Sequence, residues 1–473
     1  MDSSNSYSPS PNQTRHGTLQ YYSMDSNSPS PTQTPTNHII NMVTIDNNRL
    51  AAIQQKINTP PKILSKAAGR ATCSIFKVPK SFNDVNGKLY QPQIISIGPF
   101  HHDQQNVQMM EEHKYHYLGQ LLTRTKLALP ALFNAVAPLV GTARECYSEV
   151  ITFEDQHLLE MLVVDGCFII ELFRKVSKLV MFEEDDPIAS MSWIFPALLR
   201  DLHLLENQIP FFFLQSLYDF TCDDKQQIGD FTLATLSLGF FNFTIQRPEK
   251  IISKFKDLKP KHLLDLLRSS FITRELDPED PSKENSAPQH VIHSVSKLRQ
   301  AGIHLRPGKS ETFLAVKFKR GVIEMPKVTM DDFMSSLLAN CVTYEQCHNG
   351  HSTYFTTYAT FLDSLVNSAK DVEYLCDKNI LENYFGTEAE IATFINNLGK
   401  DVAFDIDQCY LANLFNDINT YHQNDCHVYW ATLKYTYFNT PWSFISVVAA
   451  FVLLFLTILQ TLYTVYPYYK PGN

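Results

Sequence analysis

The chain has 473 residues, of which 44% are hydrophobic, enough for a core of two or three average domains. Its 40 Lys and Arg against 49 Asp and Glu give a formal net charge of −9. No basic cluster with interleaved aromatic residues occurs, which argues against a nucleic-acid-binding protein. The nine cysteines are scattered, contain no CxxC pair and favour a reducing compartment.

The N-terminal segment, residues 1–47, is rich in Ser, Pro, Asn, Thr and Gln, and we expect it to be a disordered tail. It contains a duplication, since residues 1–14 are echoed by residues 24–34. Five hydroxyl residues each precede a proline, namely Ser8, Ser10, Ser28, Ser30 and Thr34. Two interpretations stay open: phosphorylation by proline-directed kinases, or a low-complexity expansion without a role.

The pattern of the body indicates two mainly helical parts, residues 48–275 and 291–439, joined by a polar, proline-punctuated linker at 276–290. Apolar residues at helical spacing predict helices at 112–127, 157–182 and 330–338. Thr329 and Asp332 are placed as a capping box, and Ser368 with Asp371 marks another helix start.

Two alternating segments, residues 312–319 and 322–328, predict strands joined at Arg320-Gly321. We therefore expect a mainly α body with a small antiparallel β-hairpin.

Residues 442–463 carry no charge and are long enough, at about 1.5 Å per residue, to cross a hydrocarbon core of roughly 30 Å. Candidate anchor residues are Trp442, Phe451, Leu456 and Tyr463, with the aromatic ends suited to the headgroup zone. A short tail, residues 464–473, follows. We predict a single-pass transmembrane helix; the alternative is a buried core helix.

No signal peptide precedes the body, so the last apolar segment is the first one available to a targeting machinery. This favours a cytosolic body at the plasma membrane or an endomembrane. Asn242 begins an N-x-T sequon and is a candidate glycosylation site if the body is luminal.

Several clusters suggest chemistry without matching a mechanistic motif. His101, His102, His113 and His116 suggest a metal site, and Asp165, Glu171, Asp201 and Glu206 could supply paired carboxylates. Cys341, Cys347, His348 and His351 lack the spacing of a zinc module. The structural alternatives are satisfied histidines and buried ion pairs, with Arg174, Arg200 and Arg268 as available partners. No GxSxG or kinase motif occurs, so we expect no catalytic residue, cofactor or metal.

Seven segments occur in the order of a known family and cover roughly residues 70–465. They are IISIGPFHH (94–102), MEEHKYHYL (110–118), VVDGCFIIELF (163–173), DLHLLENQIPFFFL (201–214), LLDLLR (263–268), SVSKLRQAGI (294–303) and the apolar end (441–463). Together they resemble the plant family called domain of unknown function 247. The duplicated Ser-Pro tail is not part of that pattern.

The resemblance implies a membrane span, no established enzymatic activity and no catalytic residues to carry over. Some grass members of the family are linked to self-incompatibility, a recognition between a pollen-side membrane protein and a pistil-side peptide. We therefore expect a membrane-anchored recognition or interaction protein with a protein or peptide partner. The alternative is a membrane-tethered enzyme or metal-binding protein that uses the acidic or histidine cluster. The segment 96–102 could present a loop to a partner or pack inside the body.

Overall fold

The computed structural model describes residues 46–58, 72–222, 231–276, 292–348, 352–405, 409–424 and 441–469. The chain forms two units, Met1–Thr59 and Pro60–Asn473. The described part of the first unit is one exposed helix, α1 (Asn47–Asn58). The duplicated Ser-Pro tail and residues 277–290 of the expected linker lie outside the described residues.

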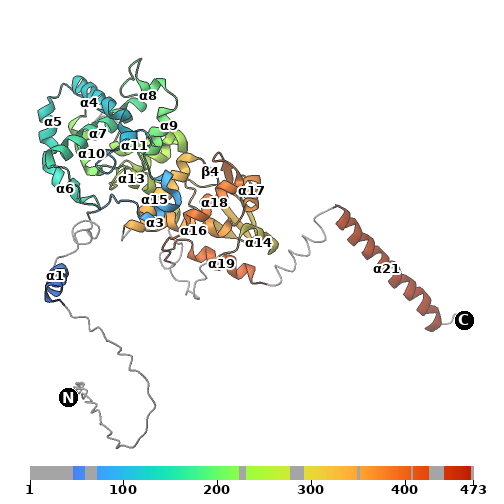
Figure 1. Ribbon diagram of the computed structural model, residues 1–473. Coiled ribbons are helices and arrows are strands. Elements are labelled where there is room, and N and C mark those ends of the chain that lie inside the picture. Colours follow the sequence, from blue (N-terminus) through green and yellow to red (C-terminus); the bar gives the residue numbers. More distant parts are fainter. Residues whose placement is uncertain are drawn as a thin grey trace, which may run out of the picture. The chain divides into compact units, whose positions relative to one another are not determined.

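The body of the second unit is mainly helical, with two small sheets (Figure 1). Its helices up to residue 276 are α3 (Lys80–Asn86), α4 (Glu111–Thr125), α5 (Leu129–Val136), α6 (Val140–Glu145), α7 (Asp155–Val176), α8 (Pro187–Ser190), α9 (Ile194–Asp201), α10 (Phe211–Phe220), α11 (Leu233–Ile245), α12 (Glu249–Ile252) and α13 (Leu263–Ser269). After residue 291 follow α14 (Val295–Gln300), α15 (Asp332–Cys347), α16 (Tyr354–Leu365), α17 (Ala369–Asp377), α18 (Glu388–Leu398) and α19 (Ala412–His422). Short 3-10 helices include η1 (Gly87–Leu89).

Helix α7 is the central element of the earlier part because it packs against α4, α10 and α11. Almost its whole length after Leu158 is buried, including four charged side chains. Gly166 allows the close approach of α10, since a Cβ at this position would lie 2.5 Å from Cδ1 of Leu217. The helix ends at Val176, earlier than its apolar pattern predicts.

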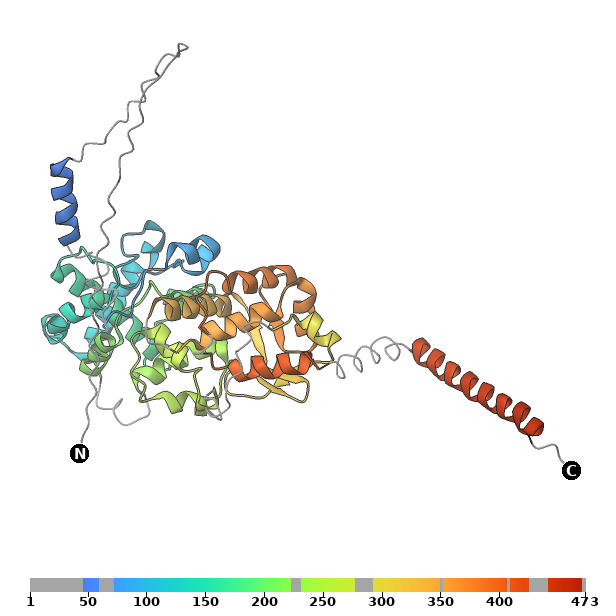
Figure 2. The same ribbon diagram turned by 90° about the horizontal axis from the view of Figure 1, so that it is seen from below.

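One hydrophobic core runs through both parts of the body. Most helices before residue 276 and most helices after residue 291 lie at opposite ends of it, with α13 and α15 between them and α3 beside α15 (Figures 1 and 2). Helix α15 connects the two ends because it contacts α9, α13, α16 and α18.

The expected hairpin is confirmed. Strands β2 (Lys317–Lys319) and β3 (Val322–Pro326) pair antiparallel. Arg320 and Gly321 at the turn both have positive φ, 52° and 77°, as a tight type I′ turn requires. The first strand is shorter than predicted, since the buried residues Phe313 to Val316 lie outside it.

The sequence analysis missed the parallel pairings. Strand β1 (His304–Gly308) pairs parallel with β3, so the three-stranded order is β1-β3-β2. Strand β4 (Val328–Met330) pairs parallel with β5 (Leu381–Asn383). Strands β4 and β5 are only three residues long, too short for a period of two to signal a strand, and β1 contains a proline.

One capping box is wrong and one is confirmed. Thr329 lies in β4, where its hydroxyl donates to Glu382, and Asp331 instead caps α15 by accepting from the Met334 N–H at 2.7 Å. Ser368 and Asp371 do form the capping box of α17.

Helix α21 (Pro441–Tyr469) contains the apolar segment Ile445–Val465, with a mean hydropathy of 2.5 and no buried share. The four expected anchor residues, Trp442, Phe451, Leu456 and Tyr463, are all exposed. Among the single helices that the structure describes, α21 is the one long and apolar enough to cross a membrane.

Candidate functional site

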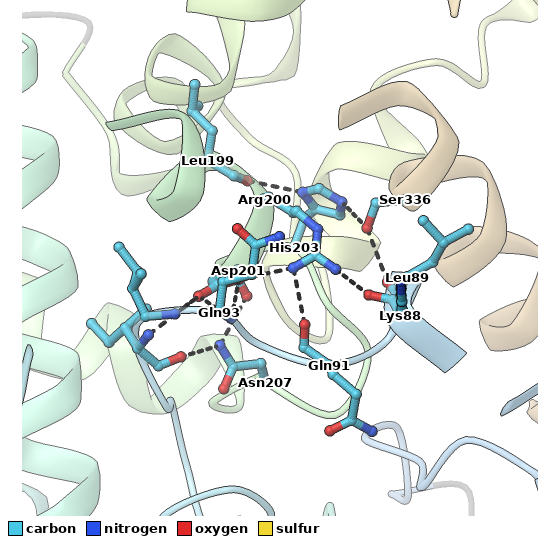
Figure 3. A network of polar contacts seen from close by, with 12 residues as sticks. Lys88, Leu89, Gln91, Gln93, Leu199, Arg200, Asp201, His203, Asn207 and Ser336 are labelled. Atoms are coloured by element: carbon cyan, nitrogen blue, oxygen red, sulfur yellow. Dashed lines mark hydrogen bonds and ion pairs between the residues drawn. The ribbon is translucent and has the colours of Figure 1, made fainter. Parts of the chain in front are cut away.

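The polar residues of the segment 201–208 hold the segment 93–98 by its backbone (Figure 3). Oδ2 of Asp201 accepts the N–H groups of Gln93, Ile94 and Ile95 at 2.9, 2.8 and 3.2 Å. Asp201 is fully buried at the end of α9. The segment 93–95 is not in a helix or strand, so its backbone N–H groups need other acceptors. A carboxylate has several acceptor sites and can therefore accept three converging N–H groups.

Asn207 continues this clamp. Its Oδ1 accepts the Ile97 N–H at 2.6 Å, and its Nδ2 donates to the carbonyls of Ile95 and Asp201 at 3.1 and 2.9 Å. Gln208 donates to the carbonyls of Leu202 and Leu204, which closes the 201–208 loop on itself. These amides satisfy backbone groups that no helix or strand pairs.

A second set of contacts connects the clamp to η1 and α15 (Figure 3). Arg200 donates to the carbonyls of Lys88 and Gln91 and lies 3.2 Å from Asp201. His203 lies between the Leu199 carbonyl, 2.9 Å from Nδ1, and the Ser336 hydroxyl, 3.2 Å from Nε2. A carbonyl only accepts, so Nδ1 of His203 carries the proton. The Ser336 hydroxyl lies between Nε2 of His203 and the Leu89 carbonyl, 3.1 Å away, and has a single proton to donate to one of them.

Asp165 ties α7 to α4 and to the 93–98 segment. Its Oδ1 lies 2.7 Å from Nζ of the fully buried Lys114, and its Oδ2 accepts the Gly98 N–H at 2.8 Å. Burial raises the pKa of Asp165, while Lys114 and the Gly98 N–H act in the opposite direction. Gly98 has a φ of 72°, and a Cβ there would lie 2.7 Å from the Gln208 carbonyl oxygen.

The remaining two acids are also paired. Glu171 lies 3.0 Å from Arg124 and 3.4 Å from Arg174, and Glu206 accepts the Val78 N–H and lies 3.2 Å from Nε2 of His101. Two of the expected arginine partners are therefore correct, Arg174 for Glu171 and Arg200 for Asp201. Arg268 instead pairs with Glu345 on α15, and the partners Lys114, Arg124 and His101 were missed.

Five pockets identified among the described residues are lined by none of the four acids. The four acids have different partner residues, and each carboxylate contacts a cation or a backbone N–H. This arrangement holds segments of the body together.

The four histidines of the first cluster have different surroundings. His101 is buried beside Glu206 and Gln104, and His102 packs against Phe153 and His157. His113 is half-buried on α4, and the exposed His116 contacts Glu183. Within the part of the chain that the structure describes, no group of three or more His, Cys, Asp or Glu is placed to hold a metal ion.

Three of the four residues of the second cluster lie in the described part of the chain. Cys341 is fully buried on α15, where burial raises the pKa of its thiol, while Cys347 is half-buried at the end of that helix. His348 packs against Phe76, and His351 lies outside the described residues.

The segment 96–102 packs inside the body. Ser96 to Pro99 and His101 are buried, and Phe100 is half-buried against Tyr147, with ring centroids 5.4 Å apart. Of the two interpretations left open by the sequence, the structure supports packing.

Asn242, the candidate glycosylation residue, lies near the end of α11. Its Nδ2 donates to the Arg247 carbonyl and its Oδ1 accepts the Arg247 N–H, both at 2.8 Å. The amide that would carry a glycan therefore stabilises the exit of the helix.

A family model described as a plant protein of unknown function, DUF247, matches residues 75–456. The chain belongs to this family.

Two relatives of the chain come from Arabidopsis thaliana. The UPF0481 protein At3g47200 is 35% identical over 438 residues, covering 87% of this chain and 91% of the relative. The putative UPF0481 protein At3g02645 is 22% identical over 484 residues, covering 82% and 89%. No solved structure matches the chain.

Proposed function

We propose that this DUF247 protein is a membrane-anchored recognition protein that does no catalysis of its own and binds a protein or peptide partner. The observation that carries the proposal is α21, whose apolar segment Ile445–Val465 has no buried share. Each buried CH₂ is worth about 0.8 kcal/mol, so an apolar helix of this length is strongly favoured in a bilayer over water.

The absence of catalysis in the proposal is supported by the four buried acids, whose carboxylates already have hydrogen-bond or ion-pair partners. Asp165, Asp201, Glu171 and Glu206 each have cation or N–H partners, which is what a structural network needs. The alternative, a membrane-tethered enzyme or metal protein, has a direct test. Stoichiometric zinc or iron in the purified full-length protein, lost on histidine substitution, would revive it.

The anchor is tested by alkaline carbonate extraction of microsomes from plant cells that express the full chain. We expect the full chain to stay in the pellet, whereas a variant that ends at residue 440 goes to the supernatant. Phe451→Arg with Leu456→Arg gives a point-substituted version of the same loss, and Phe451→Leu with Leu456→Ile is the matched apolar control. Extraction of the full chain into the supernatant contradicts membrane anchoring.

We further propose that the body faces the cytosol. A glycosylation sequon appended after residue 473 reports the side of the C-terminus, and Asn242→Gln removes the sequon of the body. We expect a glycosidase-sensitive mass shift that depends on the appended sequon and is unchanged by Asn242→Gln. A shift that disappears with Asn242→Gln instead would place the body in the lumen and favour a receptor for an extracellular ligand.

A further inference from the structure

A cavity of about 440 Å³ lies between the exit of α11, the loop after β1 and the start of α15. Its wall has an apolar side formed by Phe271, Phe333 and Met334. Its polar side carries Arg247 and Lys309, with Thr312 beside them. None of these residues belongs to the acid and histidine clusters described above.

Arg247 is held rigidly in this wall. The side chain of Asn242 forms hydrogen bonds with the backbone N–H and carbonyl of Arg247. Nη1 and Nη2 of Arg247 donate to the carbonyl and hydroxyl of Ser270, both at 3.0 Å. The guanidinium lies 4.5 Å from the centre of the Phe271 ring. The residue is only 9% exposed.

The charge of Arg247 is not compensated by the protein. Among the described residues no carboxylate forms an ion pair with it, and its Nε has no hydrogen-bond partner. The buried Arg268 and Arg174, in contrast, each pair with a glutamate. Burial lowers the pKa of Arg247 to about 10, because a desolvated cation without a counter-charge is unfavourable.

The acids of the cavity wall are already engaged. Glu311 pairs with Lys254 at 2.6 Å, and Asp331 accepts the Met334 N–H as the cap of α15. Lys327, the third cation of the wall, pairs with Glu382. Lys309 is exposed and makes no ion pair with any described residue. Arg247 and Lys309 are therefore the two cations of the wall that remain for an added anion.

We propose that this cavity binds a small organic anion, with its carboxylate or phosphate held by Arg247 and Lys309 and its apolar body packed on Phe271, Phe333 and Met334. A guanidinium uses its free N–H groups to bind such oxyanions with directional, charge-assisted hydrogen bonds. The volume falls in the range of small-molecule sites. The site does not depend on the membrane anchor, so either proposal can fail alone.

The test is isothermal titration calorimetry on the full-length protein in detergent. The probes are benzoate, phenyl phosphate, inorganic phosphate and benzyl alcohol, the last being the neutral control of similar size. We expect benzoate or phenyl phosphate to bind and benzyl alcohol not to bind. Which of the two anions binds more tightly identifies the head group.

Variants locate the binding. Arg247→Met should weaken binding about ten-fold or more, the size of one lost charged hydrogen bond, and Lys309→Gln should weaken it several-fold. Lys309 is on the surface, so its variant reports on the site even if Arg247→Met does not fold. Arg306→Gln, which removes an exposed arginine outside the cavity, should leave binding unchanged.

Three results would overturn anion binding in this cavity. The first is no heat of binding from either aromatic anion. The second is equal binding of benzyl alcohol, which would remove the role of the charge. The third is unchanged anion affinity in Lys309→Gln and in any folded Arg247→Met protein. Inorganic phosphate that binds as tightly as phenyl phosphate would overturn the assignment of an organic ligand.

Discussion

Nη2 of Arg268 on α13 lies 2.7 Å from Oε1 of Glu345 on α15, and both side chains are almost fully buried. The two oxygens of Glu345 also accept the N–H groups of Phe355 and Thr356 at the start of α16. A single carboxylate thus joins three helices from both parts of the body. Burial raises the pKa of Glu345, and Arg268 opposes that shift.

We expect Arg268→Met to destabilise the protein by about 3–5 kcal/mol, because it leaves Glu345 buried without its counter-charge. The matched control is Arg306→Met, which breaks the exposed pair with Glu324 and should cost about 1 kcal/mol or less. Urea unfolding of the full-length protein in detergent, followed by tryptophan fluorescence, measures both. Equal losses in the two variants would contradict the role assigned to the buried pair.

Asp201→Asn should cost about 3 kcal/mol or more. The amide presents N–H groups to the converging donors of Gln93 to Ile95 and removes the charge that faces Arg200. Asp84→Asn, at an exposed position on α3, should change stability by less than about 0.5 kcal/mol. The same urea experiment compares them, and limited proteolysis between residues 88 and 98 should accelerate in Asp201→Asn alone. An unchanged cleavage rate would count against the clamp.

Gly98→Ala should destabilise the body by about 2 kcal/mol or more. Its φ of 72° is unfavourable for alanine, and the added Cβ would lie 2.7 Å from a backbone oxygen. Gly119→Ala is the matched control, since nothing lies within 4 Å of a Cβ in the middle of α4. That change should stabilise the protein by roughly 0.5–1 kcal/mol through helix propensity. We expect the midpoint of thermal unfolding to fall in Gly98→Ala and to rise in Gly119→Ala.

His203 should make the body sensitive to acid. Burial lowers its pKa from 6.5 to about 3, so between these values the unfolded chain binds a proton that the folded protein does not. Stability therefore falls as pH drops from 6.5 towards 3, by up to about 1.4 kcal/mol per pH unit for one proton. Unfolding free energies measured at several pH values in this window give the slope.

His203→Gln removes this titration. We expect the unfolding free energy of this variant to change less steeply with pH over the same window, by the amount that corresponds to about one proton. His116→Gln, at an exposed position, is the control and should leave the slope near that of the unaltered protein. An identical pH dependence in His203→Gln would show that other groups cause the acid sensitivity.

The sequence alone determined the features that depend on near neighbours. The apolar helix at the C-terminus, the cap at Ser368 and Asp371, and the tight turn at Arg320-Gly321 follow from residues within one or two turns of each other. The family also follows from sequence, because several local motifs occur in one order. The mainly helical class follows from apolar spacing.

Only the tertiary structure decided how the polar residues are used. Asp201 meets backbone donors more than 100 positions earlier in the chain, and Asp165 meets Lys114 on another helix. Local spacing does not specify such partners, since they depend on which segments pack together and on which charges burial then forces into pairs. The parallel strand β1, the inward packing of residues 96–102 and the uncompensated Arg247 have the same origin.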